Sequence, residues 1–155
     1  HYGELLVNQN IYIEPIYITH HPDSVRDRQI SQTKTILYGD YKKVRGTEER
    51  ISSIGQLFLE MLSEPEKCGG MYHIIDIWRE HALKYLDQIL ETIDLCSKGI
   101  IKVRAGYILD ELMKINHPKI KSWENYAQRG GSRVLESGRP YSEPFSEKWM
   151  LSVNV

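Results

Sequence analysis

The stretch LSEPEKCGG, residues 62–70, separates two segments in which apolar residues recur at helical spacing. A proline followed by two glycines fits either a loop that cradles a phosphate or a sharp corner between helices. A phosphate loop requires a closing Gly-Lys-Ser or Gly-Lys-Thr, which this stretch lacks. We therefore predict a structural corner. Pro65 would keep the first helix from continuing, and Gly69 and Gly70 would supply the positive-φ backbone positions.

Helical periodicity extends on both sides of this corner. Before it, we expect a helix of about four turns capped by Thr47, with one apolar stripe. After it, residues 71–96 predict one long helix or two helices joined near His81. Residues 101–112 resume the period until the sequence NHPK stops it. The predicted stripes comprise Ile51, Ile54, Phe58, Met61 and Leu62, then Ile74, Ile75, Trp78, Leu83, Leu86, Ile89, Leu90 and Ile93, then Ile101, Ala105, Ile108 and Leu112.

The two ends of the chain favour strands. Residues 10–19 alternate apolar and polar side chains around Pro15, and residues 33–40 and 41–46 predict a hairpin that turns near residues 38–42. In the last forty residues the clearest strand candidate is WMLSVNV, residues 149–155. The expected fold class is α+β, with a β-rich N-terminal segment, three or four amphipathic helices in the middle and short C-terminal strands.

Composition limits the class of protein. The 155 residues include 41% hydrophobic residues, which is enough for one domain with a core, and we expect residues 1–155 to form a single domain. The formal net charge of -1 excludes the basic excess of a nucleic-acid coat protein. Two cysteines are too few for a disulfide framework, and there is no apolar run of about 20 residues. We expect a soluble, cytoplasmic protein, and the start at His1 suggests a fragment.

Metal and nuclease chemistry have weak sequence support. The six histidines form no H-E-x-x-H motif and no cysteine pair has zinc spacing, so neither a metal site nor a cofactor is predicted. Asp23, followed later by Asp40 and Lys42, matches the loose pattern of restriction-endonuclease-like nucleases, in which two acids hold magnesium. A solvated turn around Asp40 is the favoured interpretation, because that chemistry requires rigid sheet positions.

Arginines provide the candidate binding residues. In RGGSR, residues 129–133, two arginines flank Gly130 and Gly131, and they can present two guanidinium groups to phosphate or carboxylate. The alternative is a flexible loop with solvated ends. Arg104 shares a predicted helix face with Ile101, Ile108 and Glu111, where its charge either pairs within the fold or lies at an interface. Pairing within the fold is the favoured alternative. The candidate binding residues are Arg104, Arg129, Gly130, Gly131 and Arg133.

Several segments together resemble AbiEi-type antitoxins of type IV toxin-antitoxin systems. GTEERISSIGQLFLEMLSEPEKCGG, residues 46–70, is similar to that family's helix and corner, with Thr47, Glu49 and Arg50 at the helix start and Pro65, Glu66, Gly69 and Gly70 in the corner. The sequences of residues 1–6, 11–19, 103–112, 129–149 and 149–155 resemble further family segments in the same order. The family proline after the helix-starting threonine is Glu48 here, and its L-D-P is Leu135-Glu136-Ser137.

The resemblance implies the C-terminal domain of an antitoxin that neutralises a nucleotidyltransferase-type toxin in abortive-infection defence against phage. It implies binding and not catalysis. The family also represses its own operon by binding promoter DNA through an N-terminal winged helix-turn-helix domain, which we do not find in this chain. The expected partners are thus the toxin, promoter DNA through that other domain and possible second copies in a homodimer, with no membrane partner. The alternatives are a magnesium-dependent nuclease and a dimerisation or regulatory module of another transcription factor.

Overall fold

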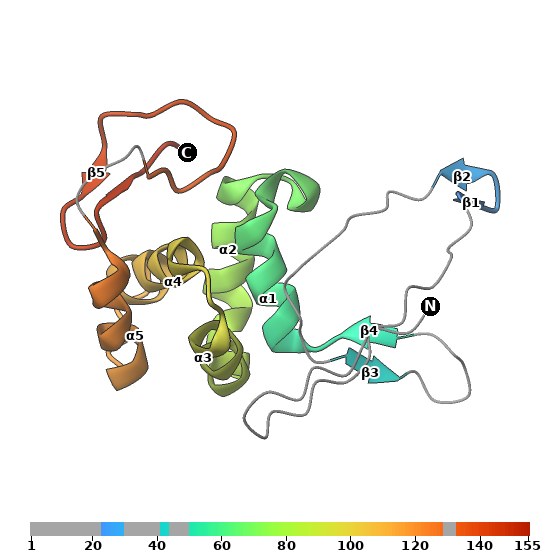
Figure 1. Ribbon diagram of the computed structural model, residues 1–155, viewed down its shortest axis with the longest axis horizontal. Coiled ribbons are helices and arrows are strands. Elements are labelled where there is room, and N and C mark those ends of the chain that lie inside the picture. Colours follow the sequence, from blue (N-terminus) through green and yellow to red (C-terminus); the bar gives the residue numbers. More distant parts are fainter. Residues whose placement is uncertain (1–22, 30–40, 44–49, 129–132) are drawn as a thin grey trace, which may run out of the picture. The chain divides into compact units, whose positions relative to one another are not determined.

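The computed structural model describes residues 23–29, 41–43, 50–128 and 133–155 (Figure 1). The chain divides into two units, residues 1–36 and 37–155. In the first unit, β1 (Ser24–Val25) pairs antiparallel with β2 (Arg28–Gln29). The described residues mix helices with short antiparallel strands, which confirms the α+β class. The strands predicted at 10–19 and 33–40, and the turn near 38–42, lie outside the described residues or at their limit.

The predicted start of the first helix at Thr47 is wrong. In the second unit β3 (Tyr41–Lys43) pairs antiparallel with β4 (Arg50–Ser52), and α1 (Ile54–Ser63) begins only after this strand. Ser53 caps the helix, since its backbone is extended and its hydroxyl oxygen accepts a hydrogen bond from the Gln56 N–H at 3.2 Å. Ile51 therefore belongs to a strand and is 55% exposed, outside the buried stripe of the helix.

The predicted corner after α1 is confirmed. α1 ends at Ser63, and a 3₁₀ turn, η1 (Pro65–Cys68), leads to α2 (Met71–His81). Gly69 and Gly70 have φ angles of 84° and 90°, in the left-handed region where a side chain is disfavoured. The Gly70 N–H donates to the Pro65 carbonyl at 2.8 Å and closes the turn.

Of the two alternatives for residues 71–96, the structure shows two helices joined near His81. After α2, the 3₁₀ turn η2 (Ala82–Tyr85) leads to α3 (Leu86–Leu95). The tighter turn of the 3₁₀ helix changes the phase of the side chains. Leu83 is consequently 65% exposed, not part of the apolar stripe. The other predicted stripe residues of α2 and α3 do face the core. Leu86 is partly buried against it, and Ile74, Ile75, Trp78, Ile89, Leu90 and Ile93 are buried.

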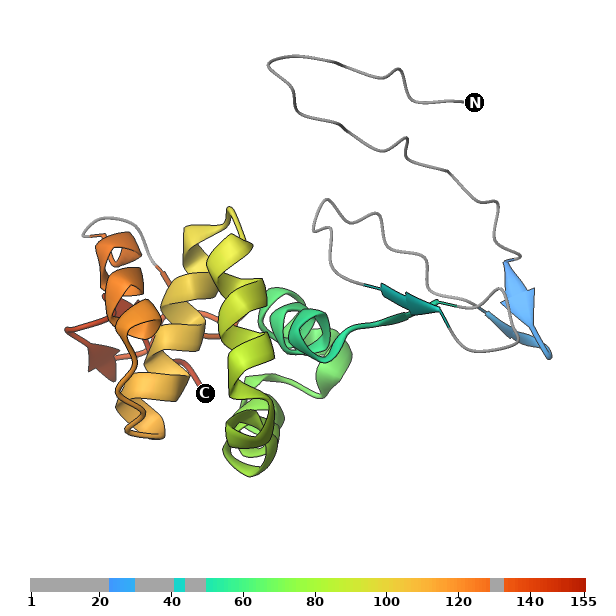
Figure 2. The same ribbon diagram turned by 90° about the horizontal axis from the view of Figure 1, so that it is seen from below.

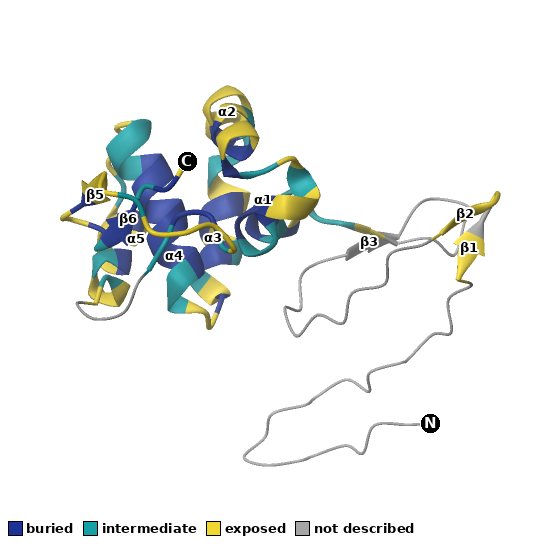
Figure 3. Cartoon of the chain, turned by 90° about the horizontal axis from the view of Figure 1, so that it is seen from above, coloured by how far each residue is buried: buried dark blue, intermediate teal, exposed yellow. Residues whose placement is uncertain are grey.

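The segment predicted as a third amphipathic helix is buried on every side. α4 (Gly99–Gly106) continues into a π-helical turn, η3 (Tyr107–Leu112), and all residues from 101 to 109 are buried. α1, α3 and α5 (Pro118–Trp123) all contact α4, which makes it the central helix (Figures 2 and 3). α5 continues into a 3₁₀ turn, η4 (Glu124–Tyr126).

The C-terminal residues form a short hairpin on this core. β5 (Phe145–Ser146) pairs antiparallel with β6 (Leu151–Ser152), and Val134 forms a parallel bridge with Ser152. The predicted strand is thus shorter than residues 149–155, because Trp149 belongs to the preceding turn. The Trp149 ring lies against Gly106 of α4, where an added Cβ would be 2.2 Å from the nearest ring atom. No helix in the described part of the chain is both long and apolar enough to cross a membrane.

Candidate functional site

The candidate site is built around Arg104, which lies inside the helical core. The residue is only 6% exposed. Its Nη1 donates to the Leu62 carbonyl oxygen at 2.7 Å, and its Nε and Nη2 donate to the Val134 carbonyl oxygen at 3.3 and 3.2 Å. Burial lowers the pKa of Arg104, and the charge of Glu66 opposes this shift. The guanidinium thus connects the end of α1 to Val134, the residue that directly follows RGGSR.

This placement corrects the expectation that Arg104 contributes to an exposed binding patch. Of the two alternatives left open by the sequence, the structure shows pairing within the fold. The partners of Arg104 are carbonyl oxygens, and no carboxylate of the described residues is bonded to it. Carbonyl acceptors are abundant at a helix C-terminus, where the last carbonyls have no partner within the helix. Arg104 can therefore act on a binding surface only through the segment that it holds.

Of the RGGSR residues, only Arg133 lies within the described chain. Arg129, Gly130 and Gly131 lie outside it. Arg133 is half-buried, and its Nη1 donates to the Tyr126 carbonyl oxygen at 2.7 Å. We define residues 127–133 as the arginine loop; this bond links the last residue of the loop to Tyr126, the residue directly before it. Arg104 holds the next residue, Val134, so the exit of the arginine loop is attached to the core.

Sequence reasoning missed a second buried charge, Glu136. The residue is 6% exposed, and its Oε2 accepts a hydrogen bond from the Met71 N–H at 3.3 Å and pairs with Arg139 Nε at 3.3 Å. Met71 is the first residue of α2, so this carboxylate occupies the helix N-terminus beside Gly70. The sequence LSEPEKCGG was compatible with either a phosphate site or a structural corner. In the structure, the anionic group at the start of α2 is the carboxylate of Glu136, which belongs to the chain itself. One signal in the sequence could have indicated such a residue: Gly70, directly before α2, has no side chain that could cap the helix.

Asn154 holds the segment that carries Glu136. Its Oδ1 accepts from the Glu136 N–H at 2.8 Å. Its Nδ2 lies 3.0 Å from the Glu136 carbonyl oxygen, 3.1 Å from that of Pro140 and 3.3 Å from that of Arg139. Asn154 is 7% exposed, and a buried amide with this many partners fixes the local backbone. We call residues 133–140 the clamp segment.

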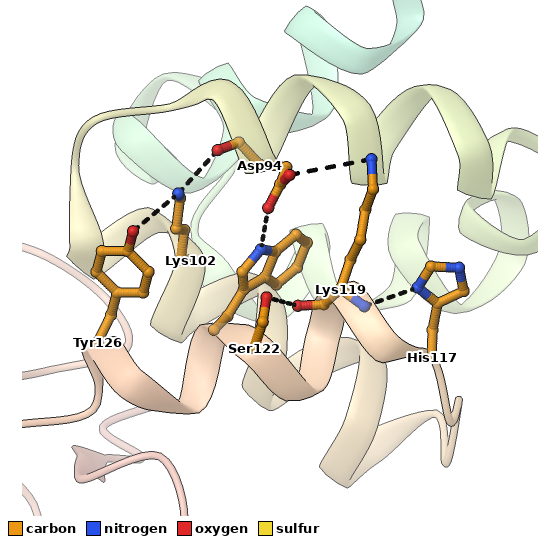
Figure 4. A network of polar contacts seen from close by, with 7 residues as sticks. Asp94, Lys102, His117, Lys119, Ser122 and Tyr126 are labelled. Carbon is orange, nitrogen blue, oxygen red and sulfur yellow. Dashed lines mark hydrogen bonds and ion pairs between the residues drawn. The ribbon is translucent and has the colours of Figure 1, made fainter.

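A second polar network, which includes Lys102 of α4, holds α5 and the residues before the arginine loop (Figure 4). Asp94 Oδ1 accepts from Trp123 Nε1 at 3.0 Å, and Lys119 Nζ lies 4.0 Å from Asp94 Oδ2. Lys102, 6% exposed, donates to the Asp94 carbonyl oxygen at 2.8 Å and lies 4.5 Å from the centre of the Tyr126 ring. This network positions Tyr126, whose carbonyl oxygen accepts from Arg133.

The nuclease pattern is only partly within the described residues. Asp23 is exposed in the first unit, Lys42 belongs to β3 of the second unit, and Asp40 lies outside the described chain. Among the residues that the structure describes, no three His, Cys, Asp or Glu side chains form a group that could hold a metal ion. Cys96 is buried and Cys68 is half-buried, and both are free thiols.

Comparison with known proteins found no matching family model, no matching curated protein and no matching solved structure. A function for this chain is therefore argued from its own residues and contacts.

Proposed function

We propose that this chain is a partner-binding domain of the AbiEi antitoxin type, which neutralises a nucleotidyltransferase-type toxin by binding it through the arginine loop and the adjoining clamp segment. The observation that carries the proposal is the attachment of this loop at both ends. Arg133 bonds to Tyr126 where the loop closes, and Arg104 holds Val134 where the chain re-enters the core.

Attached loop ends favour binding because part of the ordering cost is met before the partner arrives. A loop with two arginines presents guanidinium groups that bind carboxylates in a bidentate manner. The partner surface that fits the arginine loop is consequently acidic. The two sequence positions that supply the arginines, Arg129 and Arg133, surround two glycines that allow close backbone approach.

The rest of the proposal follows the family resemblance. The domain acts in the cytoplasm without catalysis of its own and requires no cofactor. In the full-length protein, a winged helix-turn-helix domain N-terminal to these residues binds promoter DNA and represses the operon. The order of the resembling segments along the chain, from residues 1–6 to residues 149–155, supports this assignment.

The test measures binding and growth in the same strains. The full-length protein is co-expressed with the product of the gene immediately downstream, and pull-down and growth rescue are scored together. We expect the wild type to bind and rescue, and the double variant R129A/R133A to lose about tenfold or more in affinity. The matched control is R79A/K84A, which removes two exposed charges from α2 and η2 and should leave both readouts unchanged.

Failure of the wild type to bind or rescue would overturn the antitoxin proposal. Magnesium-dependent DNA cleavage, measured with and without Asp40→Ala, then tests the nuclease hypothesis. Self-association in solution without toxin binding would instead favour a dimerisation module.

A further inference from the structure

The corner between α1 and α2 leaves two helix ends without a local side chain of the charge that suits them. The last turn of α1 contains no basic residue, and the first turn of α2 contains no acidic residue and no side-chain cap. Two buried charges from distant positions fill these roles. Arg104 donates to Leu62 at the end of α1, and Glu136 accepts from Met71 at the start of α2. In each case the sign of the charge suits the dipole of the helix end.

The same two residues attach the clamp segment to the corner. Arg104 donates to the Val134 carbonyl oxygen, and Glu136 is itself part of the segment. Leu135, between them, is fully buried, and its N–H donates to the Ser152 carbonyl oxygen at 2.9 Å. The clamp segment is thus fixed by the buried side chain of Leu135, by the bonds from Arg104 to Val134 and by the bond of the Glu136 carboxylate to Met71.

Glu136 also orients an arginine that faces solvent. Arg139 Nε lies 3.3 Å from Glu136 Oε2, while the Arg139 side chain remains 58% exposed. The carboxylate is itself held by the Met71 N–H and by burial, so it offers Arg139 a fixed partner. Within the described residues this is the one ion pair of Arg139, and its terminal nitrogens are left for an external acceptor.

We propose that Arg139 is a partner-contacting residue that binds a carboxylate on the partner surface, and that Glu136 is the residue that positions it. This inference rests on the proposed function, and it extends the binding surface from Arg133 to a second, pre-oriented arginine. A guanidinium that is already held in place loses less side-chain freedom on binding than a free one. Among the exposed arginines, Arg79 offers the contrast, because its one ion pair with the residues that the structure describes is a 3.9 Å contact with the exposed Asp76.

The first test is a double-mutant cycle in the full-length protein, with binding measured against the downstream toxin. We expect R139A to weaken binding about tenfold and E136Q several-fold, since the glutamine keeps an oxygen for the Met71 N–H but loses the charge. The double variant E136Q/R139A should bind the toxin no more weakly than R139A alone, because both substitutions remove the same contact with the partner. R79A is the control and should bind like the wild type. Unchanged affinity of R139A, or additive losses in the cycle, would overturn the inference.

The second test needs no partner. The mobility of the Arg139 Nε–H is measured by NMR relaxation in the full-length protein, beside that of Arg79. We expect Arg139 to be the more ordered of the two, and E136Q to make them alike. Equal mobility in the wild type would rule out positioning by Glu136. If the wild type fails to bind the toxin, the contact role of Arg139 is refuted together with the proposed function, whereas the mobility still decides the role of Glu136.

Discussion

α2 and α4 each carry an arginine, and the two arginines behave in opposite ways. Arg79 lies on the polar face of α2, with its side chain 54% exposed and a 3.9 Å contact to Asp76. Arg104 lies in α4, is 6% exposed and bonds to carbonyl oxygens of two other segments. The residue type is the same, and the surroundings of the helix decide its role.

The comparison shows what a central helix does for this fold. α2 covers one side of the core, so its outward side chains are free to remain in water. α4 has neighbours all round, so its polar side chains must find partners inside the protein. Lys102 and Arg104 do so by bonding to backbone carbonyls, at the end of α3 and the end of α1 respectively. The buried helix thus connects elements that are distant in sequence.

The largest effect is expected from Gly106→Ala, which attacks the packing of α4. An added Cβ would lie 2.2 Å from the Trp149 ring, and Trp149 is fully buried and cannot move aside. We expect the free energy of unfolding to fall by about 3 kcal/mol, although alanine is intrinsically the better helix former. Urea denaturation measures the change.

The control for Gly106→Ala is Gly99→Ala, at the first residue of the same helix. There the nearest atom to an added Cβ is Tyr126 Cδ1 at 3.0 Å, in a residue that is 40% exposed. Since this ring has room to adjust, the loss should be less than about 1 kcal/mol. Equal losses at the two positions would mean that the fit between α4 and Trp149 does not limit stability.

A somewhat smaller effect is expected from Arg104→Ala. The substitution leaves the Leu62 and Val134 carbonyls without their donor and opens a cavity, so we expect a loss of about 2 to 3 kcal/mol. Arg79→Ala removes an exposed arginine and should cost less than about 0.5 kcal/mol. Thermal or urea unfolding of both variants gives the difference, and similar losses would contradict the distinction between α2 and α4.

The sequence predicted those parts of the fold that depend on neighbouring residues. Pro65 and the two glycines signal a corner by their own backbone preferences, and the apolar spacing in α2 and α3 reflects one buried face. The start of α1 was mispredicted because Thr47 and Ser53 are both good caps, and strand pairing between β3 and β4 favours the later one.

The polar contacts at the corner could not be predicted in the same way. Glu136 caps a helix whose first residue is 65 positions away, and Arg104 reaches a carbonyl 42 positions away. Periodicity describes one helix face at a time, so it assigned α4 a single apolar side and could not show that other elements cover the rest. Arg104 was accordingly placed among the candidate binding residues, whereas Arg139, which the structure orients toward solvent beside Glu136, received no role.

The smallest effect concerns the tyrosines associated with the two helices. Burial raises the pKa of Tyr107, directly after α4; Glu111 raises it further, and Arg79 acts in the opposite direction. The folded state thus favours the neutral phenol.

The stability from this preference is fully present below about pH 10, where the unfolded tyrosine begins to ionise, and is lost as the pH rises above that value. In Tyr107→Phe the ring cannot ionise, so we expect urea midpoints to fall less steeply than in the wild type as the pH rises above about 10. Tyr72→Phe in α2 is the control for the loss of a hydroxyl group: the residue is 74% exposed, so this substitution should leave the urea midpoint at neutral pH unchanged. If Tyr107→Phe kept the wild-type steepness, burial beside α4 would not be what sets the alkaline response.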